Sequence, residues 1–133
     1  MALLVTGYEN IGMLLLRLVL ALVFLVHAYP KLTNPSAMSK GMKWSTSLVF
    51  LLGLLEFLSA LSVGLGFFTQ VGSLGLVVVM IGALYYKTGK WKISFIGKNT
   101  TGWEFDLVIL AAAIALLALG AGAYSIDALI GLS

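Results

Sequence analysis

Residues 44–86 read WSTSLVFLLGLLEFLSALSVGLGFFTQVGSLGLVVVMIGALYY, and their only Lys, Arg, Asp or Glu is Glu56. As one α-helix this stretch would be about 64 Å long, because the helix rises about 1.5 Å per residue. The hydrocarbon core of a bilayer is about 30 Å thick, so the stretch is predicted to cross it twice. The break is expected at GLGFFTQVG, residues 64–72, where glycines weaken the helix and Thr69 and Gln70 add polarity.

Two further apolar runs flank this pair of helices. The first is followed by Pro30 and a polar segment, which are expected to end it. The second begins after Thr101-Gly-Trp-Glu104, which fits a capping box with an interfacial Trp. The sequence therefore predicts an all-α integral membrane protein, a single domain over residues 1–133. Its four transmembrane helices are expected at about 11–29, 47–66, 71–86 and 104–124.

Composition supports a lipid environment and excludes several kinds of chemistry. The chain is 61% hydrophobic and 10% charged, whereas about 45–50% apolar residues are usual in soluble domains. It has no Cys and one His, which excludes disulfides, iron–sulfur clusters, thiolate-held haem and bis-His haem within this chain. The net charge of +3 comes from lysines in two short segments, so no nucleic-acid partner is expected.

The lysines also predict an orientation in the membrane. The segment 30–46 holds Lys31, Lys40 and Lys43, and the segment 87–103 holds four more lysines, whereas the remaining polar segments carry none. Positively charged loops stay preferentially on the cytoplasmic side. Both segments are therefore expected to be cytoplasmic, with both termini on the outer side of a multi-pass protein.

Two charges fall within the predicted spans. Arg17 and Glu56 are expected at similar depth, with an axial offset of about 6 Å, so we predict an ion pair between them, with Asp127 as a second candidate partner for Arg17. The pair could be structural, or it could line a substrate or proton path. In a third interpretation Arg17 extends to the outer headgroups and Glu56 is protonated, without any partner or function.

A second polar group is predicted near the cytoplasmic side, where His27 and Lys31 end one helix and Glu104 and Asp106 begin another. Positions 104 and 106 are about 200° apart on a helix, so only one of them can face His27. No metal site is predicted, because one His with these carboxylates does not form a recognisable ligand spacing. The aromatic residues nearby are typical of an interfacial belt rather than a quinone site; they are Trp44, Tyr85, Tyr86 and Trp91.

Small residues mark the expected packing face of each helix. Close helix contact in lipid depends on van der Waals packing, which small side chains allow. The positions are Ala21, Gly64, Gly75, Gly82, Ala115 and Gly122.

Several of these features together resemble the DoxX family of small four-helix membrane proteins. The stretch LLRLVLALVFLVHAYPKL, residues 15–32, is similar to the family's pattern in the first helix. Residues 102–105, GWEF, and residues 120–127, GAGAYSID, resemble the family's last helix and the segment after it. Ala28 and Ala121 depart from the pattern, where Gly and Pro are usual. The other matching positions are Arg17, Phe24, His27, Lys31, Leu32, Glu56, Gly64, Phe68, Thr69, Met80 and Ala83.

The resemblance implies a four-helix bundle in a prokaryotic cytoplasmic membrane and association with quinone-linked oxidation. The favoured hypothesis is an auxiliary subunit of a membrane oxidoreductase, with no redox cofactor bound by this chain alone and with quinone or lipid as a ligand. Arg17, Glu56 or the His27 group would then bind quinone oxygens. The alternatives are a structural or assembly module, and a small proton or solute transporter using Arg17 and Glu56. An enzyme acting alone is the least favoured class. Expected partners are lipids and other membrane subunits, or further copies of the chain.

Overall fold

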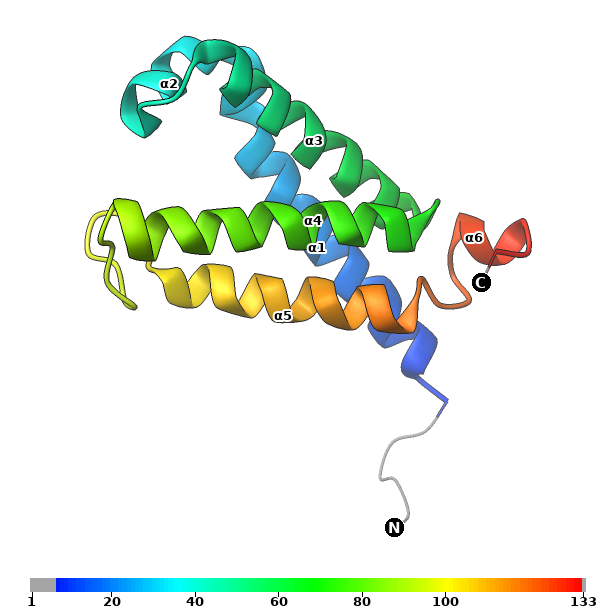
Figure 1. Ribbon diagram of the computed structural model, residues 1–133. Helices are drawn as coiled ribbons and strands as arrows, with labels where there is room; N and C mark the ends of the chain where they lie inside the picture. Colours follow the sequence, from blue (N-terminus) through cyan, green and yellow to red (C-terminus); the bar gives the residue numbers. More distant parts are fainter. Residues whose placement is uncertain (1–6, 133) are drawn as a thin grey trace.

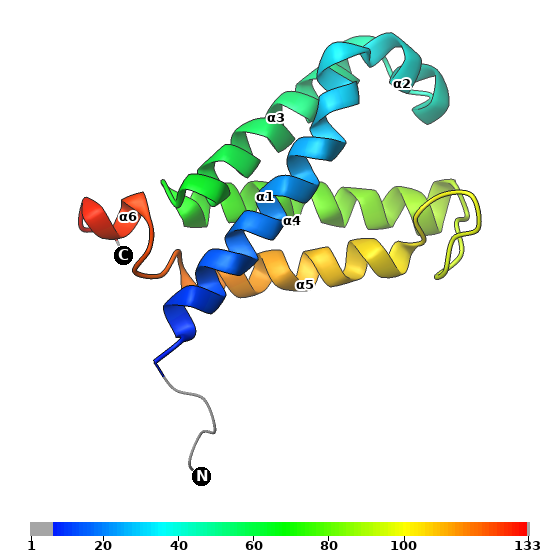
Figure 2. The ribbon, with the colours of Figure 1, turned by 180° about the vertical axis from the view of Figure 1, so that it is seen from behind.

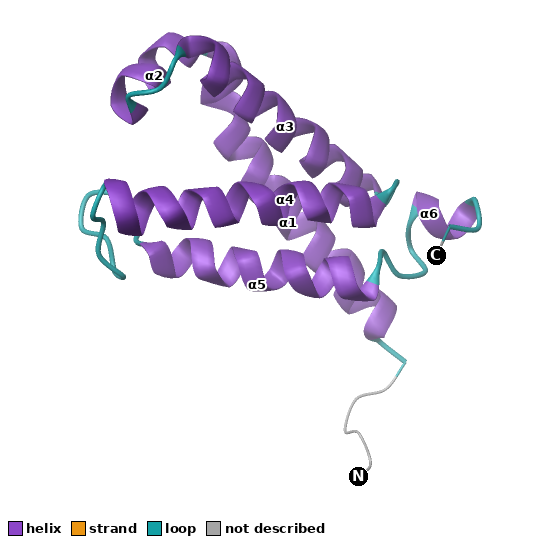
Figure 3. Cartoon of the chain, viewed as in Figure 1, coloured by secondary structure: helices purple, strands orange, loops and turns teal. Residues whose placement is uncertain are grey.

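The computed structural model describes residues 7–132, all of whose regular structure is helical (Figures 1 and 3). The all-α prediction is therefore confirmed for this part of the chain, and residues 1–6 and 133 of the predicted domain lie outside it. The elements are α1 (Glu9–Thr33), α2 (Pro35–Met42), α3 (Thr46–Leu65), α4 (Thr69–Tyr85), the π-helix η1 (Tyr86–Lys90), α5 (Trp103–Leu119) and α6 (Ile126–Leu129).

Three of the described helices are long and apolar enough to cross a membrane: α1, α3, and α4 continued by η1. The outward surface suits lipid, because exposed apolar residues follow one face of α1 at helical spacing. Leu15, Val19, Leu22 and Val26 are each more than half exposed. The chain is thus a membrane protein with several apolar helices. The fourth predicted span corresponds to α5, which has 17 residues.

Helix α1 continues past Pro30 to Thr33, so the predicted end at residue 29 is wrong. Proline lacks only its own N–H, and near a helix end this removes a single bond while the following turn still forms. The N–H of Asn34 donates to the carbonyl of Pro30 at 2.8 Å and closes that turn. Lys31 consequently lies on the helix rather than in a loop.

The helices form two antiparallel pairs, α1 with α3 and α4 with α5, and the two pairs are inclined to each other (Figures 1 and 2). We call the end of the molecule that carries α2 and residues 91–102 the α2 end. The opposite end, with α6 and the turn between α3 and α4, is the α6 end. The pairs lie farthest apart at the α2 end (Figure 1).

Small residues set the spacing and register of neighbouring helices. A β-carbon added at Gly64 would lie 3.0 Å from that of Ala21, and one added at Gly53 would lie 2.7 Å from that of Lys31. An added β-carbon at Gly75 would collide with Ser59, so α3 and α4 also pack closely. In this register Arg17 lies beside Gly66, at the α6 end of α3.

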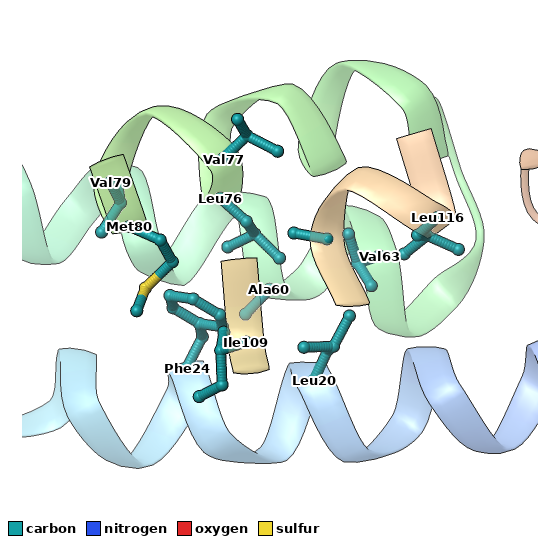
Figure 4. Packing of buried hydrophobic residues seen from close by; sticks show 11 residues of the cluster. Leu20, Phe24, Ala60, Val63, Leu76, Val77, Val79, Met80, Ile109 and Leu116 are labelled. Atoms are coloured by element: carbon teal, nitrogen blue, oxygen red, sulfur yellow. The ribbon is translucent and has the colours of Figure 1, made fainter. Parts of the chain in front are cut away.

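The apolar core lies where the two pairs cross (Figure 4). Leu20 and Phe24 of α1 meet Val63 of α3, Met80 of α4 and Ile109 of α5, and all five are at least nine-tenths buried. Toward the α2 end this core gives way to a cavity.

Candidate functional site

A cavity of about 380 Å³ lies between the two helix pairs at the α2 end. Its floor is formed by the core residues Phe24, Met80 and Ile109, and Trp44 and Trp91 lie at its other end. All four long helices contribute to its walls, together with α2 and the segment before α5. The volume falls within the range of about 300–1,000 Å³ that is usual for small-molecule sites.

Two ion pairs line this cavity, one in each helix pair. The Lys31 ammonium of α1 lies 2.9 Å from both carboxylate oxygens of Glu56 of α3. The Lys87 ammonium of η1 lies 2.6 Å from Oδ2 of Asp106 of α5. Glu56 and Asp106 are 3% and 4% exposed. Each carboxylate thus has the cationic partner that a charge out of water requires.

The ammonium of Lys87 has further partners beyond Asp106. It donates to Oγ1 of Thr101 at 2.8 Å and to the Thr101 carbonyl at 3.2 Å. Lys87 lies in the π-helical turn that follows α4, and such turns are frequent at functional sites. From the sequence, Lys87 is expected only as one of the four lysines of the cytoplasmic segment 87–103. Lys87 directly follows one apolar span, and Asp106 lies at the start of the next span. These positions are the sequence signal from which the Lys87–Asp106 pair could have been predicted.

The aromatic residues at the α2 end form part of the cavity wall. Tyr86 contacts Trp44 and Trp91, with ring centroids 5.0 and 5.6 Å apart. The His27 ring lies 5.7 Å from that of Phe105 and so connects α1 with α5 across the cavity. Of the four residues predicted as an interfacial belt, Tyr85 alone points outward, with 57% of its surface exposed. The other three give the cavity flat apolar surfaces.

The predicted polar group of His27, Lys31, Glu104 and Asp106 comes together only in part. His27, Lys31 and Asp106 line the cavity, whereas Glu104 does not. This agrees with the expectation that only one of the two carboxylates can face His27. Within residues 7–132, no three His, Asp or Glu side chains lie close enough to share a metal ion.

The predicted ion pair between Arg17 and Glu56 is wrong. Glu56 is bound by Lys31, whereas both terminal nitrogens of Arg17 donate to the carbonyl of Tyr124, at 3.1 and 2.7 Å. The prediction placed the outer ends of the first two spans at the same depth. The first two turns of α1 instead extend beyond α3, so Arg17 reaches the level of Gly66, about ten residues or 15 Å from Glu56.

Arg17 and Glu56 are nevertheless both shielded from lipid by the bundle. They are 1% and 3% exposed, which agrees with the expectation that charges within the membrane face the protein interior. The Arg17 guanidinium binds within the protein, on the Tyr124 carbonyl.

Asp127, the second candidate partner for Arg17, instead caps the start of α4. Its carboxylate accepts the N–H groups of Phe68 at 2.7 Å and Thr69 at 2.9 Å. Phe68 has a left-handed backbone with φ of 49°, which is strained for a side chain of this size. Burial opposes ionisation of Asp127, but the hydrogen bonds from Thr69 and Phe68 and the charge of Arg17 outweigh it and lower the pKa.

The six predicted packing residues have different environments. Ala21 and Gly64 face each other, Gly75 packs on Ser59, and Gly122 approaches Met13 of α1. Ala115 is half-buried on α5. Gly82 differs from the others: it lines the cavity, and an added β-carbon there would have no atom within 4 Å.

Comparison with known protein families identifies the family of this chain. The model of the DoxX family matches residues 12–89, from α1 to η1. The matched range includes Lys31, Glu56 and Lys87 of the cavity, and it ends before α5. No curated protein and no solved structure matches the chain.

Proposed function

The chain belongs to the DoxX family, and on that premise we propose that it is an integral membrane subunit that binds a quinone for a membrane oxidoreductase. The observation that carries the proposal is the cavity between the helix pairs, because it combines flat aromatic walls with hydrogen-bond donors. Lys31 uses two of its three N–H groups on Glu56, so its third N–H and the His27 ring can donate to the carbonyl oxygens of a quinone. Tyr86 and Phe105 offer surfaces on which its ring can pack.

The charge balance of the cavity favours a neutral ligand. Each lysine is paired with a carboxylate, so the walls present donors without a net charge. An anionic headgroup would meet Glu56 and Asp106 as well as the two lysines, and like charges at close range disfavour binding. A quinone carbonyl requires only a donor.

The redox chemistry would reside in a partner subunit. A chain with no Cys and a single His cannot itself hold an iron–sulfur cluster or a bis-His haem. A protein that binds a quinone but carries no electron-transfer centre would present the quinone to another subunit. The apolar residues exposed on α1, α3 and α4 offer surfaces on which that subunit, or a second copy of the chain, could pack within the bilayer.

The same proposal includes a membrane topology. We take α5 as the fourth span, because it lies antiparallel to α4 along nearly its whole length. The seven lysines all belong to the α2 end. By the positive-inside rule this end faces the cytoplasm, and both termini face outward. The cavity would then receive its ligand from the cytoplasmic half of a prokaryotic cytoplasmic membrane.

A structural or assembly role is the second candidate, and one observation favours it. Each ion pair joins the two helices of one pair, so the charges could serve only to hold the bundle together. The transporter alternative required Arg17 and Glu56 on one path. They lie about 15 Å apart along α3, with the buried core residues Ala60 and Val63 of α3 between their levels, and nothing in their positions supports that path.

Two experiments test the proposal. The full-length chain, extracted gently from its native membrane, should retain a redox subunit, whereas migration only as a free oligomer would contradict the subunit role. In the second experiment the purified chain is illuminated with an azido-quinone and digested. Labelled peptides should contain cavity residues such as Trp44 or Tyr86, and excess unlabelled quinone should suppress the labelling. Labelling that is confined to lipid-facing peptides, or that resists competition, would leave the structural role as the better explanation.

A further inference from the structure

Gly82 is the one glycine of the described bundle that borders the cavity. It lies on the face of α4 that also carries Val79 and Tyr86, one turn away on either side, and all three line the cavity. Between those two side chains the helix therefore exposes its bare backbone. The gap in this row of side chains forms a recess in the cavity wall.

No close contact between helices accounts for this glycine. An added β-carbon at Gly53, Gly64, Gly72 or Gly75 would come within about 3 Å of a neighbouring helix, which is reason enough for a glycine there. At Gly82 an added β-carbon would have no atom within 4 Å. Glycine is disfavoured in a helix interior compared with alanine, and packing of the chain on itself does not require it here.

An open position alone does not identify a binding surface, as Gly12 of α1 illustrates. It too has no atom within 4 Å of an added β-carbon, but it is exposed on the outside of the bundle and does not line the cavity. The distinguishing feature of Gly82 is the space in front of it. That space is the cavity that both ion pairs border.

The recess is also placed correctly relative to the polar groups. Lys87 follows Gly82 by five residues, about 7.5 Å along the helix, and its ammonium is held toward the cavity by Asp106 and Thr101. A flat ring lying against Gly82 would thus have the Tyr86 side chain at one edge and the Lys87 ammonium near a carbonyl oxygen on that edge. A side chain at position 82 would occupy the same volume.

We infer that Gly82 determines the ligand specificity of the cavity, because its missing side chain makes the recess that receives the ring of the quinone. This inference rests on the proposed function and adds to it the residue that sets the accepted ring size. A small side chain at position 82 should exclude a two-ring naphthoquinone, whereas a larger side chain is needed to exclude a one-ring benzoquinone.

The test compares Gly82→Ala and Gly82→Leu with the matched variants Gly12→Ala and Gly12→Leu. The full-length purified chain is titrated with a short-chain 1,4-benzoquinone and with 2-methyl-1,4-naphthoquinone, and quenching of tryptophan fluorescence reports binding, since Trp44 and Trp91 line the cavity. In Gly82→Ala the naphthoquinone should lose at least about tenfold in affinity, as one added methyl group can cause in a filled pocket, and the benzoquinone should lose less. Gly82→Leu should abolish binding of both.

The Gly12 variants should bind both quinones like the wild type. Thermal unfolding accompanies every titration, and Gly82→Ala should unfold at or above the wild-type temperature because alanine favours the helix. Wild-type affinity for both quinones in Gly82→Leu would overturn the inference and leave the proposed function standing. A wild-type chain that binds neither quinone would overturn the proposed function and the inference with it.

Discussion

Lys31 binds Glu56 through both carboxylate oxygens, each 2.9 Å from its ammonium nitrogen. The pair connects α1 to α3 at the cavity wall, and Lys87 with Asp106 connects η1 to α5 on the opposite side. The two halves of the bundle are therefore built alike at the α2 end. Each half supplies a buried carboxylate and the lysine that neutralises it.

Removing the Lys31 ammonium should destabilise the bundle more than removing both charges. In Lys31→Met the Glu56 carboxylate stays buried without a cation, and we expect a loss of about 3 kcal/mol in the free energy of unfolding. The double variant Lys31→Met, Glu56→Gln should recover part of that loss, since an amide is less costly to bury. Unfolding in mixed micelles measures both, with the exposed Lys40→Met as the control. Equal losses in the single and double variants would contradict this expectation, because they would show that the unpaired Glu56 carboxylate carries no penalty.

The cap formed by Asp127 should contribute stability that depends on pH. In Asp127→Asn one acceptor oxygen is replaced by an NH2 group, so one of the N–H groups of Phe68 and Thr69 loses its partner, and we expect a loss of about 1–3 kcal/mol near neutral pH. Because the pKa of Asp127 is lowered in the folded chain, this contribution is complete above the unfolded pKa of about 3.9 and disappears as the pH falls through the folded pKa. The wild type and the variant should thus converge in acid. A constant difference between pH 7 and pH 2 would contradict the assignment.

Arg17 should hold the segment before α6 against the bundle. The chain has no Cys, so Ser125→Cys introduces a single thiol at a buried position, 8% exposed. Adding Arg17→Met removes two hydrogen bonds to the Tyr124 carbonyl. A hydrogen bond to a charged group contributes about 1.5–3 kcal/mol, so modification of Cys at position 125 should accelerate at least about tenfold. As a control, Leu129→Cys places a thiol at an exposed position, and it should react at the same rate with Arg17 and with Arg17→Met. If Arg17→Met leaves the rate at position 125 unchanged, Arg17 does not hold this segment.

The absence of cysteine also makes the topology testable. Single cysteines replacing Ser36 and Gly89, both exposed at the α2 end, should be protected from a membrane-impermeant thiol reagent added to intact cells. A cysteine replacing Leu129, which is 85% exposed at the α6 end, should react. Reaction at positions 36 and 129 from the same side would show that the number of membrane crossings between them is even, contrary to four spans. Permeabilised cells provide the control, because all three positions should then react.

Composition and hydrophobic patterning are sufficient to predict the helical membrane fold of this chain. Burial of Arg17 and Glu56 was also predictable, because a charge within the membrane is costly wherever it faces lipid. The relative depth of the helices was not predictable. The sequence of α1 contains no signal that its first two turns extend beyond α3, and this offset separates Arg17 from Glu56.

The cavity could be predicted only in part. His27, Lys31 and Asp106 were candidates because they lie near helix ends, but Pro30 suggested that Lys31 lay outside the helix, and the proline in fact removes one hydrogen bond only. Gly82 resembles the packing glycines in sequence. Only the inclination of the two helix pairs determines that it faces empty space, and this angle depends on the whole set of contacts in the core.

The capping of α4 by Asp127 has a consequence for synthesis of the protein. The cap follows Phe68 by 59 positions, and a ribosome adding about 5–20 residues per second needs roughly 3–12 s to make that length of chain. During this interval the strained turn at Phe68 has no carboxylate to hold it. Helix α4 therefore enters the membrane before the turn at its start is fixed. That turn becomes ordered only after α5 and the segment that carries Asp127 have been synthesised.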